Sequence, residues 1–156
     1  MGAAFQVEHG HFVNILPAVD ITGGATGDRF HMKNFKKAII VISVGVSAAA
    51  WTKIIVRSCD AATSGTATDI AFSLYSEETA LGDTLSARTA VAATGHTPSA
   101  NNGIMYVIEI DADELLDGHD WVELALTNGS NSVIASAVAI LTGARYAGDL
   151  SATAIV

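Results

Sequence analysis

The histidines of this 156-residue chain are the first candidates for chemistry, because imidazoles bind metal ions and transfer protons. His9 and His11 are two positions apart, so on a strand both rings would lie on the same face, as metal ligands can. No third ligand follows nearby, and the other histidines, His31, His96 and His119, lie in separate segments. We therefore interpret the pair as the polar edge of an N-terminal arm, and we expect no metal and no cofactor.

The densest group of acidic residues begins at Asp111 and could surround a calcium ion with carboxylate oxygens. A calcium loop of the EF-hand type closes on a glutamate at its twelfth position, whereas Glu123 is the thirteenth residue counted from Asp111. Acids are also favourable at the positive N-terminal end of a helix. We therefore predict one short helical turn near 111–117, ended by Gly118, instead of a metal site.

Motifs for phosphate binding and nucleophilic catalysis are incomplete or missing. The glycine-rich segment Thr22–Gly27 has no lysine and no predicted helix after it, which a phosphate-binding loop requires. No serine lies in a G-x-S-x-G motif. The single cysteine, Cys59, alternates with Trp51 and Arg57 in an apolar stretch, which predicts a small core residue. We expect no catalytic residue, and we expect that the protein is not an enzyme.

Composition points to contacts with other chains. Hydrophobic residues make up 50% of the chain and charged residues only 15%, against about 25% in typical globular domains. The mean hydropathy is +0.40. A single domain of this size has a limited interior, so we expect part of its apolar surface to be buried against other chains.

The charge pattern and the N-terminal segment exclude several classes of partner. The net charge is −8 and the lysines and arginines are scattered, so we expect no nucleic-acid binding. No apolar run reaches the roughly 18 to 20 residues of a membrane helix, and the N-terminus lacks the pattern of a signal peptide. We therefore expect synthesis in the cytoplasm and no membrane association.

Alternating apolar and polar residues predict strands along most of the chain. Phe35–Cys59 indicates two strands joined by a turn of small residues, and the first of them is apolar on both faces. Such a strand lies between two layers or is covered by a neighbouring chain. Ile104–Ile110 alternates most clearly, and Asn128–Gly129 predicts a hairpin turn before a further strand, Val133–Leu141.

Eight or nine strands of five to ten residues, separated by turn signals, are typical of an all-β fold. We predict an antiparallel β-sandwich, jelly-roll-like, with at most one short helical turn. The predicted division of the chain is an N-terminal arm (1–10), the β-sandwich domain (11–142) and a C-terminal tail (143–156).

Three stretches together resemble a known family: Phe30–Val41, Met105–Leu115 and Leu141–Asp149. Their order is similar to that in small structural proteins of tailed bacteriophages that are encoded near the major capsid protein. Members of this group are cement or decoration proteins on the outside of the head, commonly trimers near three-fold positions. The likeness runs from about residue 11 to 149 and consists of strand patterns and a loop.

The resemblance implies a non-enzymatic virion protein that binds the outer surface of a phage head and cements neighbouring capsid subunits. Its implied partners are copies of itself, as a homotrimer, and the major capsid protein. We expect contacts from the arm, with Phe5 and Val7, or from the tail, with Tyr146 and Leu150.

Two other functions are compatible with the same fold. In a carbohydrate-binding or host-attachment module, Trp51, Trp121 or Tyr75 would stack on sugar rings, although we favour the interpretation of the two tryptophans as buried anchors of the sandwich. A cupin-type enzyme would need a compact set of histidine and glutamate metal ligands, which the five histidines do not provide.

Overall fold

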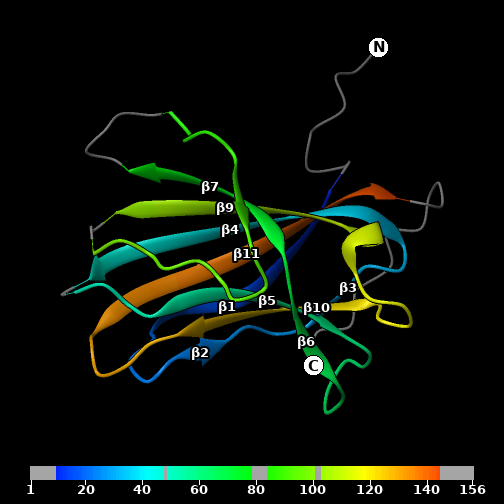
Figure 1. Ribbon diagram of the computed structural model, residues 1–156, viewed down its shortest axis with the longest axis horizontal. Helices are drawn as coiled ribbons and strands as arrows, with labels where there is room; N and C mark the ends of the chain where they lie inside the picture. Colours follow the sequence, from blue (N-terminus) through cyan, green and yellow to red (C-terminus); the bar gives the residue numbers. More distant parts are fainter. Residues whose placement is uncertain (1–9, 48, 79–83, 101–102, 145–156) are drawn as a thin grey trace.

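The computed structural model describes residues 10–47, 49–78, 84–100 and 103–144, which form two antiparallel sheets packed face to face (Figure 1). The six-stranded sheet has the order β1 (His11–Asp20), β11 (Val133–Ala144), β4 (Phe35–Ser47), β9 (Ile104–Asp111), β7 (Phe72–Glu78) and β8 (Thr89–Val91). The five-stranded sheet has the order β2 (Ala25–Thr26), β10 (Trp121–Thr127), β5 (Lys53–Cys59) and β6 (Ala67–Ile70), and β3 (Phe30–His31) also pairs with β10. The predicted antiparallel β-sandwich is confirmed.

The core lies between the two sheets and follows the predicted alternation. In β9 the four residues from Ile104 to Ile110 on one face are buried, with at most 3% exposure, and the residues between them are half-buried. In β10 the core residues are Val122, Leu124 and Leu126. Fully burying one such side chain contributes about 1.5–3 kcal/mol, so the alternation of apolar residues is the main determinant of which face of each strand points inward.

One predicted pairing of strands is wrong, because the chain crosses between the sheets at two turns. Residues 35–59 form two strands as predicted; β4 pairs with β11 and β9, whereas β5 pairs with β10 and β6 in the other sheet. The Asn128–Gly129 turn likewise leads from β10 in one sheet to β11 in the other, so it does not close a hairpin. Turn residues let the chain reverse, but packing decides whether the next strand pairs beside the first or lies across the core from it.

The short segments after β7 and β9 differ in how well they were predicted. The helical turn near 111–117 is present as a 3-10 turn, η3 (Ala112–Glu114), and the Glu114 carboxylate accepts a hydrogen bond from the Asp111 backbone N–H at 2.9 Å. The weak alternation from Leu85 to Ala93 predicts a longer strand, but the structure limits it to β8, and Leu85 is 45% exposed. Within the described ranges, no helix has the length and hydropathy needed to span a bilayer.

Candidate functional site

Between its buried residues Val133 and Leu141, the strand β11 turns its larger apolar side chains away from the core. Its inward residues include Ala135, Ala137 and Ala139, each at most 1% exposed. Its outward residues are larger: Ile134, which is 40% exposed, and the half-buried Val138 and Ile140. A strand of an isolated sandwich normally does the opposite, with large apolar residues in the core and polar ones outside. This inversion marks the outer face of the six-stranded sheet as the candidate functional site.

The register carries this apolar surface across neighbouring strands. Phe12 of β1 lies opposite Ile140, which lies opposite Ile39 of β4. Two residues further along the strands, Val138 lies opposite Val41, which lies opposite Val107 of β9. We call the surface formed by the outward apolar residues of β1, β11, β4 and β9 the outer apolar face; its members are Phe12, Ile39, Val41, Met105, Val107, Ile134, Val138 and Ile140.

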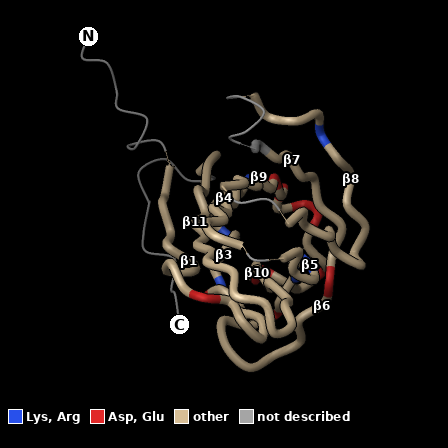
Figure 2. The backbone as a smooth tube through the Cα atoms, turned by 90° about the vertical axis from the view of Figure 1, so that its left-hand side faces the viewer, with Lys and Arg blue, Asp and Glu red and all other residues tan. Residues whose placement is uncertain are grey.

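Charges are confined to the border of the outer apolar face. The segments 11–19, 38–47 and 133–144 contain no Asp, Glu, Lys or Arg, and the tubes of β1, β11 and β4 are tan over most of their length in Figure 2. At one end, Lys37 forms an ion pair with Asp111 at 3.6 Å. Toward β7, the Tyr75 hydroxyl donates a hydrogen bond to Glu109 Oε2 at 3.2 Å. The surface is therefore an uncharged patch with a polar border.

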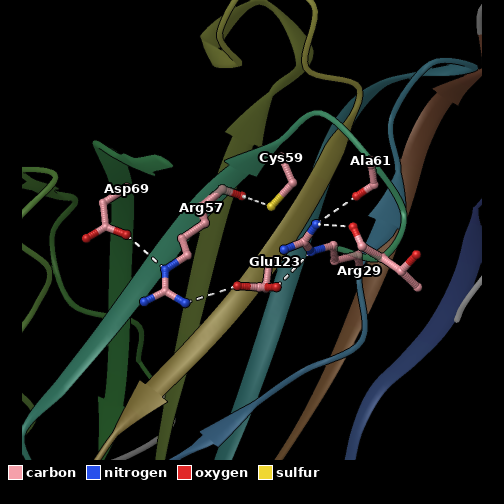
Figure 3. Close-up of polar contacts among 7 residues, drawn as sticks. Arg29, Arg57, Cys59, Ala61, Asp69 and Glu123 are labelled. Atoms are coloured by element: carbon pink, nitrogen blue, oxygen red, sulfur yellow. Dashed lines mark hydrogen bonds and ion pairs between the residues drawn. The ribbon is translucent and has the colours of Figure 1, made fainter. Parts of the chain in front are cut away.

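The outer face of the five-stranded sheet is different, because a network of paired charges occupies it (Figure 3). Glu123 is 7% exposed and lies between two arginines, with Oε2 2.8 Å from Arg29 Nε and Oε1 3.1 Å from Arg57 Nη1. Arg57 Nε also pairs with Asp69 at 2.9 Å. Arg29 Nη1 donates to the backbone oxygens of the loop that follows β5, at Ala61 (2.8 Å) and at residue 63 (2.9 Å).

This network holds a loop on the sheet. The hydrogen bond to Glu123 is the main cause that raises the pKa of Arg29. This is expected, because a hydrogen bond to a carboxylate stabilises the charged form of the guanidinium. Sequence reasoning considered Glu123 only as a calcium ligand and missed this role. The available signal was an acid in the middle of the apolar strand 121–127, opposite Arg57, where an acid needs a cation.

Cys59 is fully buried, and burial is the main cause that raises the pKa of its thiol to about 11. A thiol in this environment stays protonated near neutral pH and is a poor nucleophile. The prediction of a small core residue is confirmed.

The residues of the alternative carbohydrate site do not share a surface. Trp51 is 2% exposed, as predicted for a core anchor. Trp121 is only half-buried, and it stacks on His31 with ring centroids 4.6 Å apart on the five-stranded sheet. Tyr75 lies on the other sheet, where it contacts Glu109. In the described part of the chain these three residues therefore form no common stacking platform.

Other predicted contacts lie outside the part that can be described. Phe5, Val7, Tyr146 and Leu150 are all outside the described residues, as is His9. His11 begins β1 and stacks on Phe35. No group of three or more His, Cys, Asp or Glu side chains among the described residues is arranged to hold a metal ion.

Comparison with known proteins finds a distant structural neighbour. No family model matches the chain, and no curated protein matches it. Among solved structures, the crystal structure of the SPBc2 prophage-derived protein YomS is similar, with 15% sequence identity and a TM-score of 0.48. The match covers 84% of this chain and 92% of that chain. YomS is thus a distant structural neighbour of this chain.

Proposed function

We propose that this protein is a structural component of a bacteriophage particle that binds the outside of the head and cements neighbouring capsid subunits. It acts without catalysis, as a homotrimer, and its partners are its own copies and the major capsid protein. The sequence resemblance motivates this function. The observation that carries it is the outer apolar face, because an uncharged sheet face with large outward side chains is suited to adhesion between proteins.

The size of this surface agrees with a role that depends on many weak contacts. Covering the area that its eight side chains still expose, on the order of 400 Å², would contribute about 10 kcal/mol. Association itself costs roughly 4–15 kcal/mol, so one such face binds weakly alone. Copies linked through this face bind the head far more tightly than one copy does, since each further contact with the head becomes intramolecular. A head covered by linked copies is then better able to resist the pressure of its DNA.

Reconstitution on heads that lack the protein tests this function. Purified protein should bind such heads up to a fixed number of copies and should raise the temperature at which they disrupt. Bound copies are counted by gel densitometry after sedimentation, and head stability is measured by the release of DNA on heating. An unrelated acidic protein at the same concentration controls for nonspecific adsorption. Absence of saturable binding, or absence of the protein from purified virions, would overturn the proposal.

A further inference from the structure

We infer that the outer apolar face is covered by a second copy of this same chain. The inference rests on the proposed function, since it names the partner of that same surface. It assigns contacts between copies to the outer face of the six-stranded sheet, and it leaves the contact with the head to other surfaces.

The absence of charge restricts which partner fits. A partner that placed an ionised group over segments 38–47 or 133–144 would lose the hydration of that group and find no opposite charge there. The partner surface must therefore be apolar and uncharged over the same extent. The chain itself presents such a surface, and in a homo-oligomer the same residues are available on every copy.

The distribution of acids favours approach through this face. Two copies with a net charge of −8 each repel one another at distances within about 10 Å of their charges at moderate salt. On the six-stranded sheet the nearest acids are Asp20 at the end of β1 and Glu109 and Asp111 on β9, all at the border of the face. Each of these carboxylates has a polar partner. Contact centred on β11 and β4 keeps the acids of both copies at the periphery, where water still screens them.

The extent of the face is close to the lower limit for a specific interface, as expected for a weak contact between copies. Four adjacent strands at about 4.8 Å spacing and six residues along β11 give a patch on the order of 20 Å by 20–25 Å. That is roughly 500 Å², an area that also holds the uncharged polar side chains of Asn14, Ser43 and Ser136, which lie in the same rows as members of the face. A typical stable interface buries about 800 Å² on each partner.

A competing explanation is that Val and Ile occur on the outer apolar face only because β-branched residues favour strands. They would then be found there whether or not another chain buries them. Threonine separates the two explanations, because it keeps the branched shape and adds a hydroxyl. The double variant Val41→Thr/Val138→Thr should keep the fold yet weaken association, whereas Val41→Lys/Val138→Lys should abolish it. Leu116→Lys is the matched control, since Leu116 is also exposed, at 43%, but lies outside the face.

Sedimentation equilibrium of the full chain and its variants provides the test. At about 100 μM, where even weak pairs assemble, the wild type should have the mass of two or more chains. The lysine variant should have the mass of one chain and associate at least ~100-fold more weakly, because it would bury unpaired charges. The threonine variant should be intermediate and the control unchanged, with circular dichroism verifying the fold. Added salt should strengthen association, because it screens the repulsion between acidic copies.

The outcomes separate this inference from the proposed function. A wild type that stays a single chain, or a lysine variant that assembles as the wild type does, would overturn the inference. If single chains nevertheless bind heads, the head function stands and the assignment of the face falls. If the copies assemble through the face but never bind heads, the assignment of the face stands and the proposed head function falls.

Discussion

Asp20 shows how a single carboxylate joins two segments that are far apart in the sequence. Its Oδ2 accepts a hydrogen bond from the Ser132 hydroxyl at 2.7 Å. Its Oδ1 accepts from the backbone N–H and the hydroxyl of Thr22, at 3.0 and 2.8 Å, and from the Val133 N–H at 3.2 Å. These donors, Ser132 first, lower the pKa of Asp20 to about 2 from its usual 3.8. The end of β1 is thus tied to the start of β11.

We expect Asp20→Asn to remove part of the acid sensitivity of the fold. A carboxyl whose pKa is lowered on folding adds stability above its unfolded value of 3.8, and that stability is lost as the pH falls toward about 2. The drop in the free energy of unfolding between pH 5 and pH 2, measured by urea denaturation, should therefore be smaller in the variant. Asp113→Asn removes the same charge from an exposed position of η3 and serves as the control. An equal drop in wild type and D20N would contradict the prediction.

Among the elements, the segment Thr94–Gly103 between β8 and β9 is predicted from the sequence only as a long loop. The structure attaches it to β5 through two backbone hydrogen bonds, Ile54 N–H to the His96 carbonyl at 2.8 Å and His96 N–H to the Ile54 carbonyl at 2.9 Å. Gly95 allows this approach, because its φ is +86° and a Cβ there would lie 2.7 Å from the Ile54 oxygen. The loop therefore extends the five-stranded sheet where β6 does not reach.

Gly95→Ala should destabilise the protein by at least about 2 kcal/mol, since a left-handed φ costs roughly 1–2 kcal/mol and the methyl group would displace the loop from β5. Gly129→Ala is the matched control, because nothing lies within 4 Å of a Cβ at that position. Urea unfolding of the two variants measures the difference. Equal stabilities would show that the bridge to β5 is dispensable.

At the scale of the whole molecule, the register of β1 with β11 sets where the chain ends leave the sandwich. His11 lies opposite Leu141, so the N-terminal arm and the C-terminal tail depart from the same end of this strand pair. Both predicted contact segments are thus joined to strands that contribute to the outer apolar face.

Deleting residues 1–9 should leave the melting temperature nearly unchanged and lower the number of copies bound per head. The buried residues of β1 begin at Val13, so the core loses nothing, whereas Phe5 and Val7 are the predicted contacts. The double variant Phe5→Ala/Val7→Ala should reproduce the loss, and Gln6→Ala is its control. Scanning calorimetry and head sedimentation measure the two effects. Full occupancy by the truncated chain would exclude the arm as a contact.

The sequence by itself determined the class of fold, the alternation of β9 and β10, the helical turn after Asp111 and the burial of Trp51 and Cys59. These features depend on local periodicity and turn chemistry, which are present in any short window of residues. Only the tertiary structure decided that β4 and β5, like β10 and β11, belong to different sheets, and that Glu123 lies between two arginines. It also decided that the two-sided apolarity of β4 continues across β1, β11 and β9 as one surface. Strand pairing and cross-strand contact join residues distant in the chain, so local patterns do not contain them.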